Sequence, residues 1–538
     1  MSLVQQLREK IGFQNIVSED TLYNKVKKSL TINGKIIFVG NLLERAAKNY
    51  PNQTAVICQK KSISYEELFL RSVLLSKKIK NLGIKPGDKA LLLFENSIEF
   101  YISYFAILQI GAVCVPLNTF LHQKELLSII NDCHPKIVVI SKKLSSNLTN
   151  IQHKDLKILR GDDIDWNVCI EDLKNEAKDF TLQTLPENEV CLLLYTSGTT
   201  GVPKGVMLSS RNIMANTIQS LARLGMHMKL KDSLDKNEIF KERFLAALPL
   251  FHSFAQNTCV WFPIAMCGTI IVIPKIDRRE ILEGLKEKPT FFGGVPALYG
   301  LLCLMKTAPL DSIKLFVSGG DAMPDKIRCA FSMVYGRKIC AGYGLSEASP
   351  VVAVNIENKE NSTNVVGKPL VGIECDIRDE GGKPIGKSKI GMLWIRGENI
   401  MLGYYNSPEE TSKILKDGWL NTGDLARLDA NNHLEIMGRS KDLIIHKGFN
   451  IYPQEIENVL LTHPAVFKAA VVAHEDATSG QVPIAFVAVK PGDETVEFRL
   501  KGFCDEYLAS YKIPRKFVCL DDLPMNSTGK VDKKKLQI

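Results

Sequence analysis

A loop of hydroxyl and glycine residues stands directly after the apolar run Leu192-Leu193-Leu194 and covers residues 195–205. Close-set backbone N–H groups, short hydroxyls and one lysine after a buried strand suit the binding of polyphosphate. Pro203 and Gly205 stand where a Walker A loop has glycine before the lysine and Ser or Thr after it, so the ordinary P-loop is excluded. A flexible linker is the alternative, but linkers rarely follow directly on a buried strand or contain Pro-Lys-Gly.

More motifs follow downstream, at residues 342–350 (Gly-Tyr-Gly-Leu-Ser-Glu-Ala-Ser-Pro), 419–425 (Trp-Leu-Asn-Thr-Gly-Asp-Leu), 438–445 (Gly-Arg-Ser-Lys-Asp-Leu-Ile-Ile), 450–457 and 527–532 (Ser-Thr-Gly-Lys-Val-Asp). In this order and at these separations they resemble the adenylate-forming superfamily of acyl-CoA synthetases, nonribosomal adenylation domains and firefly luciferase. The resemblance runs from about residue 40 to residue 536. Residues 248–254 and 401–405 are most similar to AMP-forming medium- and long-chain fatty acyl-CoA synthetases.

Composition places the chain among globular proteins. A length of 538 residues is enough for two to four domains, and 24% charged with 45% hydrophobic residues is typical of a folded, water-soluble chain. Residues 1–35 contain no apolar signal segment, and the most apolar stretch, residues 259–273, is interrupted by Pro263 and Gly268. We expect a cytoplasmic protein, with peripheral contact to the inner face of a membrane left open.

The cysteines and the net charge restrict the class further. Thirteen cysteines without a C-x-x-C spacing argue against a disulfide framework or structural zinc and favour buried thiols in a reducing compartment. The net charge of +9 fits a solvated lysine-rich surface, or attraction to anionic lipid, CoA phosphates or an acidic carrier protein. No nucleic-acid partner is expected, and the oligomeric state stays open.

The pattern of apolar runs predicts an α/β fold. Between residues 54 and 141, predicted strands (89–94, 113–117, 136–141) alternate with predicted helices (97–110, 124–132), the first helix with Asn96 as N-cap. This βαβαβ pattern indicates a parallel sheet covered by helices, and a second run of the same kind covers residues 244–339.

After Val351 the sequence pattern changes to short predicted strands separated by glycines, which predict a small β-rich subdomain. Beyond Arg439 the sequence predicts a compact α/β unit whose first helix starts at Pro453. The prediction is therefore a large N-terminal adenylation (AMP-binding) domain, residues 1–438, and a small C-terminal domain, residues 439–538. By the resemblance, the small domain is mobile about a hinge at Lys441.

The resemblance also assigns the phosphate and metal sites. The residues implied to hold the β- and γ-phosphates of ATP are Thr196, Ser197, Gly198, Thr199, Thr200, Gly201 and Lys204. Glu347 and Thr196 are implied to bind Mg²⁺, which prefers hard oxygen ligands. Ser346 stands where the family more often has threonine, and it keeps the hydroxyl that would meet the α-phosphate.

Adenine needs a flat apolar slot. Tyr343, followed by Gly344, offers a ring face, and Gly319 with Gly320 allows close backbone approach after a predicted strand. A simple turn is the alternative for the two adjacent glycines.

Asp424 would accept the ribose hydroxyls with support from Arg439, although an Asp after Thr-Gly is more often a turn residue or a helix cap. His252 is implied to gate the acyl and thiol passages, although a lone histidine is usually structural. Phe254 is implied to line the acyl pocket.

Catalysis of the first step is assigned by resemblance to Lys530, which would contact the acyl carboxylate and the α-phosphate. A solvated basic tail is the alternative, since residues 533–535 are lysines too. Rotation about Lys441 would then bring residues 445–450 to the site, where Gly448 would let the pantetheine arm pass.

The favoured activity is ATP-dependent ligation of a fatty acid to CoA through acyl-AMP, with release of pyrophosphate. An acyl-acyl carrier protein synthetase is the main alternative, and a luciferase-like oxygenase is another. A non-enzymatic binder would need degraded catalytic positions, whereas Lys530, Glu347, Asp424 and Arg439 are all present. The sequence does not predict acyl chain length or physiological pathway.

Overall fold

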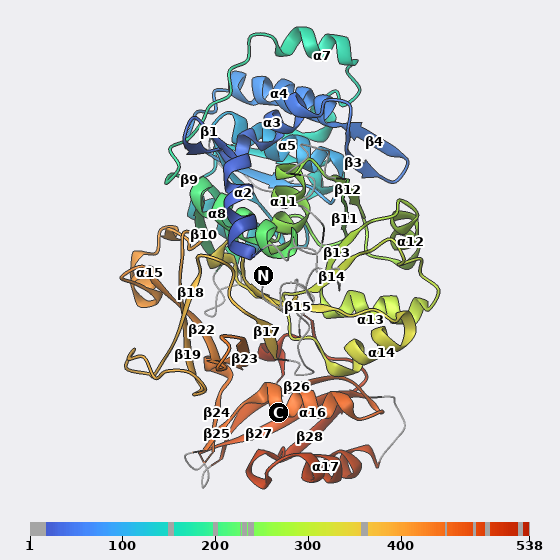
Figure 1. Ribbon diagram of the computed structural model, residues 1–538, viewed down its shortest axis with the longest axis vertical. Coiled ribbons are helices and arrows are strands. Elements are labelled where there is room, and N and C mark those ends of the chain that lie inside the picture. The colour runs from blue at the N-terminus through green and yellow to red at the C-terminus, as the bar shows by residue number, and fades with distance from the viewer. Residues whose placement is uncertain are drawn as a thin grey trace, which may run out of the picture.

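The computed structural model describes residues 18–148, 155–196, 203–225, 228, 234, 241–356, 364–446, 449–476, 480–489, 495–525 and 531–536. Figure 1 shows the order of the parts along the long axis of the molecule, with the C-terminal unit at one end and the first sheet toward the other. The structure confirms the predicted α/β fold, with two large sheets, a β-rich subdomain and a small C-terminal α/β unit.

The first sheet has seven strands. In spatial order they are β20 (Gly403–Tyr404), β10 (Lys204–Ser209), β9 (Val190–Thr196), β6 (Val113–Pro116), β5 (Lys89–Leu93), β7 (Ile137–Ile140) and β8 (Lys157–Arg160). From β9 to β8 the strands run parallel, and β10 and β20 join them antiparallel. Both faces of β5 are buried, because Ala90 and Leu92 belong to one core and Leu91 and Leu93 to another. Burial on both faces explains why this strand reads as a continuous apolar run.

The helix after β5 shows a small error in the sequence prediction. Helix α5 (Ile98–Gln109) has Ser97 as its N-cap, whose hydroxyl accepts a hydrogen bond from the Phe100 N–H at 3.2 Å. The Asn96 side chain instead binds backbone groups of Leu248, Leu250 and Ile273. Asn96 therefore ties the first sheet to the second, a long-range role that local capping rules do not predict.

The second sheet has eight strands. In spatial order they are β16 (Val351–Val354), β15 (Cys340–Gly344), β14 (Leu315–Ser318), β13 (Phe291–Gly294), β11 (Arg243–Ala246), β12 (Thr269–Val272), β3 (Thr54–Cys58) and β4 (Lys61–Ser64). The strands from β15 to β3 are parallel, and β16 and β4 are antiparallel edges. Parallel alignment brings the carboxyl ends of β13, β14 and β15 to one edge of the sheet.

Helices fill the space between the two large sheets and cover their outer faces. The inner group comprises α3 (Leu42–Asn49), α4 (Tyr65–Asn81), α5, α8 (Ser210–Gly225), and α10 (Ser253–Gln256), which continues through a π-helical turn (Asn257–Trp261) into α11 (Phe262–Ala265). Helix α6 (Gln123–Cys133) packs on the outer face of the first sheet. Helices α12 (Arg278–Lys286), α13 (Pro296–Met305) and α14 (Asp325–Tyr335) lie along the second sheet in Figure 1.

The predicted β-rich subdomain is a third sheet. Its strands are β17 (Val365–Gly367), β23 (Leu434–Arg439), β22 (Trp419–Leu428), β19 (Gly391–Arg396) and β18 (Glu374–Arg378), with β21 (Leu415–Lys416) paired to β22. Helix α15 (Pro408–Ile414) lies between β20 of the first sheet and β21 in the chain.

The C-terminal unit contains β24 (Ile444–His446), β25 (Phe449–Ile451), α16 (Pro453–Thr462), β26 (Val466–Asp476), β27 (Gly480–Val489), α17 (Val496–Tyr507) and β28 (Lys516–Leu520). Its buried side chains form clusters of their own, separate from the large cluster that ends at Leu434. Pro453 starts α16 as predicted, since proline fits the first helical turn.

Two expectations from composition can be compared with the structure. All thirteen cysteines are free thiols. Within the described ranges, no helix is both long enough and apolar enough to cross a membrane.

Candidate active site

A buried carboxylate connects the second and third sheets. Asp424 on β22 has a side chain only 5% exposed, and its Oδ1 lies 2.9 Å from Nε of Arg439 on β23. Its Oδ2 accepts a hydrogen bond from the hydroxyl of Tyr343 on β15. Burial, and then the neighbouring Asp424 charge, raise the pKa of the Tyr343 phenol well above its usual value. Three predicted nucleotide residues therefore meet in one cluster.

The local backbone explains this arrangement. Asp424 and Arg439 are direct cross-strand partners in the β22–β23 ladder. The Asp424 N–H donates to the Thr422 hydroxyl at 3.1 Å, and Nη1 of Arg439 donates to the Thr422 carbonyl at 3.2 Å. Gly423, which lies between Thr422 and Asp424 in the chain, has φ +72°, a backbone conformation that glycine adopts without strain.

Glu347 lies in the short 3₁₀ turn Ser346–Ala348, which closely follows β15. Its Oε1 accepts a hydrogen bond from the Tyr404 hydroxyl at 2.7 Å, and its backbone carbonyl accepts one from the Met401 N–H at 2.9 Å. The neighbouring Ser346 Oγ lies 3.1 Å from Ser253 Oγ on α10. Strand β20 and helix α10 thus converge on this predicted magnesium and phosphate region.

Lys204 begins β10 and pairs in the ladder with Thr196, the last residue of β9. Its Nζ lies 2.6 Å from Oε2 of Glu410 on α15 and 5.2 Å from the centre of the Tyr404 ring. The Thr196 hydroxyl is 3.5 Å from the Lys204 carbonyl oxygen. The lysine therefore has a carboxylate partner and an aromatic face.

Glycines form the carboxyl edge of the second sheet. A Cβ at Gly319 would lie 3.3 Å from Cζ of the Phe254 ring, which also lies next to Gly293 at the end of β13. Gly320 has φ +82°, and a Cβ at Gly344 would lie 2.2 Å from the Pro350 carbonyl oxygen. These positions need glycine for conformation or for close packing.

His252 and Lys441 both occupy defined places in the fold. His252 is the N-cap of α10, and its Nδ1 accepts a hydrogen bond from the Phe254 N–H at 3.3 Å. Lys441 lies in a 3₁₀ turn (Ser440–Asp442) directly after β23, and the Ser440 hydroxyl donates to the Gly423 carbonyl at 3.1 Å. His252 therefore has a capping role that could account for it without catalysis.

Seven predicted site residues lie outside the described residues: Ser197, Gly198, Thr199, Thr200, Gly201, Gly448 and Lys530. Sequence reasoning in turn missed three side chains of the site, namely Tyr404, Glu410 and Ser253. Tyr404 belongs to a segment that carried the family resemblance, so a signal was present. Glu410 reads as an ordinary acidic residue of a first helical turn, and only its contact with Lys204 reveals it.

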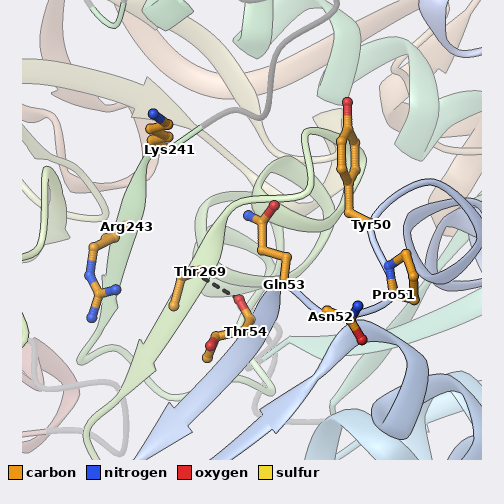
Figure 2. Close-up of a pocket in the computed structure, with 8 residues that line it drawn as sticks. All are labelled: Tyr50, Pro51, Asn52, Gln53, Thr54, Lys241, Arg243 and Thr269. Carbon is orange, nitrogen blue, oxygen red and sulfur yellow. Dashed lines mark hydrogen bonds between the residues drawn. The ribbon is translucent and has the colours of Figure 1, made fainter.

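A cavity of about 510 Å³ lies elsewhere in the molecule, as Figure 2 shows. Thr54, Arg243 and Thr269 line it at the amino ends of β3, β11 and β12, and the Thr269 hydroxyl donates to the Thr54 carbonyl at 2.8 Å. The candidate site lies at the carboxyl ends of the same sheet, where ligands of open parallel sheets usually bind. The cavity is therefore separate from the candidate site.

Comparison with known proteins identifies the family. The model of the AMP-binding enzyme family matches residues 43–405, and the model of the AMP-binding enzyme C-terminal domain matches residues 455–530. The chain is 30% identical over 534 residues to the long-chain-fatty-acid–CoA ligase of Bacillus subtilis (strain 168), covering 92% of this chain and 93% of that protein.

Solved structures agree. ATP-bound MatB from Rhodopseudomonas palustris has a TM-score of 0.82 and 29% identity, covering 92% of this chain and 97% of the other. The o-succinylbenzoate CoA synthetase MenE of Bacillus subtilis, in complex with its acyl-adenylate intermediate, has a TM-score of 0.81 and 27% identity, covering 93% and 98%. MenE was also solved with ATP and a magnesium ion, with a TM-score of 0.79 and 28% identity, covering 92% and 99%.

The fold is that of the adenylate-forming enzymes, a large α/β domain with a β-subdomain and a small C-terminal α/β domain. The chain belongs to the AMP-binding enzyme family. It is an enzyme of the AMP-forming acid–CoA ligase family, with the adenylate-forming chemistry of acyl- and aryl-CoA ligases.

Proposed function

We propose that this enzyme joins a fatty acid to CoA. The observation that carries the proposal is the 30% identity to a long-chain-fatty-acid–CoA ligase over 92% of the chain. Phe254 supports it as well, because this residue, implied by the family resemblance to line the acyl pocket, packs against Gly293 and Gly319 at the glycine edge. An aromatic side chain at that place suits an alkyl chain. MenE, named for an aromatic acid, represents the competing substrate class.

In the first step, a carboxylate oxygen of the acid attacks the α-phosphorus of ATP, and the bond to the pyrophosphate leaving group breaks. The resulting acyl-AMP has a good leaving group. In the second step the CoA thiol, having lost its proton, attacks the acyl carbon, and AMP leaves. The task of the protein is to align the reacting groups and to stabilise the charge that develops on the phosphate.

We assign the nucleotide contacts to the cluster described above. Asp424 would accept the two ribose hydroxyls, with Arg439 holding its carboxylate in place, and the Tyr343 ring would cover adenine beside Gly319, Gly320 and Gly344. Lys204 would neutralise the β- and γ-phosphates together with residues 197–201, which lie outside the described residues. Ser346 would meet the α-phosphate.

The donor set also fits Mg²⁺. Glu347 supplies one carboxylate and Thr196 one hydroxyl, which suits an ion that keeps several waters and binds phosphates rather than an all-protein cage. Consistent with this, the described residues contain no cluster of three or more His, Cys, Asp or Glu side chains that could hold a metal. When bound with ATP, the ion would neutralise phosphate charge.

The second half of the proposal concerns domain motion. We assign the first-step charge stabilisation to Lys530 and the pivot to Lys441, with residues 1–438 and 439–538 as the two bodies. Separate buried cores on either side of Arg439 support this division. Gly448 would line the pantetheine passage after rotation, and His252 would lie between the acyl and thiol passages.

The direct test is ATP–pyrophosphate exchange with a series of fatty acids from octanoate to stearate and with ferulate and o-succinylbenzoate. We expect at least one fatty acid to exceed both aromatic acids in specificity constant by about tenfold, or roughly 1.4 kcal/mol. An aromatic acid with the highest specificity constant would contradict the fatty-acid assignment and leave the ligase family unaffected.

The acceptor needs its own test. The enzyme receives ATP, palmitate and equal concentrations of CoA and holo-acyl carrier protein, and both thioesters are followed by mass spectrometry. We expect acyl-CoA to dominate. A specificity constant about tenfold higher for the carrier protein would replace CoA as the acceptor.

A further inference from the structure

Glu410 carries a contact that the proposed chemistry does not use. It lies in the first turn of α15, and its Oε2 is 2.6 Å from Nζ of Lys204 while its Oε1 contacts Lys413. The Lys204 side chain is 16% exposed and that of Glu410 36% exposed, so the pair is partly shielded from water. This distance lies at the short end for a charge-assisted hydrogen bond between an ammonium and a carboxylate.

The backbone places Glu410 there. Strand β20 pairs antiparallel with β10, and the Tyr405 N–H donates to the Gly205 carbonyl at 2.8 Å, one residue after Lys204. Helix α15 is tied back to β20, because the Tyr404 N–H donates to the Thr411 hydroxyl at 2.9 Å. The Lys204–Glu410 pair therefore follows from strand register and is more than a chance meeting of long surface side chains.

The same segment touches the second polar group of the site. Tyr404, the second residue of β20, donates a hydrogen bond from its hydroxyl to Glu347, and the Lys204 ammonium lies over its ring. Residues 403–414 thus supply an anion to the lysine assigned to phosphate and a donor to the carboxylate assigned to magnesium. ATP with its metal ion would need both groups for itself.

We propose that Glu410 competes with the β- and γ-phosphates of ATP for Lys204 and thereby sets the affinity of the enzyme for ATP. This inference rests on the proposed role of Lys204. Binding of the polyphosphate brings further negative charge to an ammonium that already holds a carboxylate, so Glu410 must withdraw or be repelled. Lys413, three residues along α15, offers the carboxylate an alternative partner.

Glu410 is ionised throughout the working pH range. Hydrogen bonds from Lys204 and then Lys413 lower its pKa to about 2 from the usual 4.5. Glu410 itself therefore keeps its charge between about pH 6 and 9, and the competition is best measured above about pH 8, where the terminal phosphate of ATP, with a second pKa of about 6, is fully ionised too. Lys204, Lys413 and the Tyr404 phenol are the titratable groups that face it in the described structure.

The test compares Glu410→Gln with Glu409→Gln, a matched change at the neighbouring exposed carboxylate of the same helix turn. The dissociation constants of ATP and AMP are measured by calorimetry, without any acid substrate. We expect Glu410→Gln to bind ATP about threefold more tightly, the scale of a partly exposed charge interaction, and AMP unchanged, because AMP lacks the β- and γ-phosphates. Glu409→Gln should match the parent for both nucleotides.

A double-mutant cycle separates competition from other effects. In a Lys204→Met background the gain from Glu410→Gln should disappear. Unchanged or weaker ATP binding by both Glu410→Gln and Glu410→Ala would overturn the proposal, as would a gain that persists without Lys204. Glu410→Ala provides a second variant should Gln retain the hydrogen bond, and thermal unfolding checks that each variant is folded.

These outcomes are distinct from failure of the proposed function. An enzyme that binds ATP with the expected ratios but exchanges pyrophosphate with no fatty acid would keep the Glu410 inference and lose the substrate assignment. An enzyme that is active on fatty acids but whose ATP affinity does not change on substitution of Glu410 would keep the substrate assignment and lose the Glu410 inference.

Discussion

At the scale of single residues, Asp424 is the group whose surroundings are most specific. Its carboxylate is buried, yet it has both a cation and a phenol as partners, so its charge is compensated without water. Loss of Arg439 would leave the buried carboxylate without its cation, whereas the Arg439 side chain is 48% exposed and can be solvated without Asp424.

We predict that Asp424→Asn lowers kcat/KM for ATP by about tenfold to a hundredfold, the scale of losing charge-assisted hydrogen bonds. Asn keeps the shape but donates where the ribose hydroxyls and Arg439 need an acceptor. Asp429→Asn is the control, since Asp429 lies at the exposed turn between β22 and β23 and pairs with His433. Equal losses in the two variants would mean that Asp424 acts only through the stability of the sheet.

A second prediction concerns the thiols. Burial raises the pKa of Cys191 and Cys259 to about 12, so at pH 8 both the scarcity of thiolate and the lack of access oppose alkylation. Of the thirteen cysteines, Cys169, Cys329 and Cys519 are exposed. Native iodoacetamide labelling read by mass spectrometry should modify these three first, and unfolding in urea should expose all. Early labelling of Cys191 or Cys259 would contradict the packing of the core.

At the scale of elements, the carboxyl end of β15 determines where Ser346 and Glu347 lie. Gly344 is the last residue of β15, and its Cα lies so close to the Pro350 carbonyl that a Cβ would clash with it. The Leu345 N–H donates to the same carbonyl at 2.9 Å. Any side chain at position 344 would push the turn that carries the two site residues.

We therefore predict that Gly344→Ala destabilises the protein by about 1–3 kcal/mol, as overpacking does, and reduces pyrophosphate exchange. Gly300→Ala is the matched change in α13, where the nearest atom to the new Cβ is 3.6 Å away. The free energy of unfolding of that variant should rise by about 0.5–1 kcal/mol, because alanine suits a helix interior better than glycine does. Urea unfolding of the two variants and the parent measures the difference in the free energy of unfolding. A Gly344→Ala variant as stable as the parent would show that the backbone at position 344 adjusts at no cost in stability.

At the scale of the whole molecule, the chain crosses from one core to another within a few residues. Arg439 ends β23 at the site, Lys441 occupies the 3₁₀ turn, and Ile444 already belongs to the core of the C-terminal unit. Among the described residues, contacts across this boundary include polar ones: the Lys326 ammonium is 3.1 Å from the Val466 carbonyl oxygen, and Nε2 of Gln454 is 3.4 Å from Oδ1 of Asn364. The rotation proposed above would exchange polar contacts of this kind for others.

Lys441→Pro tests the pivot. Proline is tolerated in the first turn of a helix, so the present conformation should persist while rotation about φ is blocked. We expect pyrophosphate exchange to survive and thioester formation from supplied acyl-AMP to collapse. Lys441→Ala should leave both half-reactions working, and equal impairment of both by the proline variant would place the pivot elsewhere.

Much of this protein could be predicted from its sequence. The strands β5, β6 and β7 and the helices between them follow from local periodicity, because a strand buried on both faces must be apolar throughout and a covering helix must repeat its apolar side. The order of the motifs also predicted the family. The Asn96 cap was wrong for a related reason, since two capping residues stood side by side and only the packing against residues 248–273 decided between them.

The side-chain partnerships of the site were decided by the tertiary structure. Tyr343 and Asp424 are 81 residues apart in the chain, and Lys204 and Glu410 are 206 apart. The first pair joins strands of two different sheets, β15 and β22, whereas the second depends on the β10–β20 register within the first sheet and on the start of helix α15. A shift of β10 by one residue would turn the Lys204 side chain to the other face of the sheet. Local sequence carries residue type and spacing, whereas the meeting of distant charges requires the packed sheets, and this is why the nucleotide motifs were predictable and the contact between Glu410 and Lys204 was not.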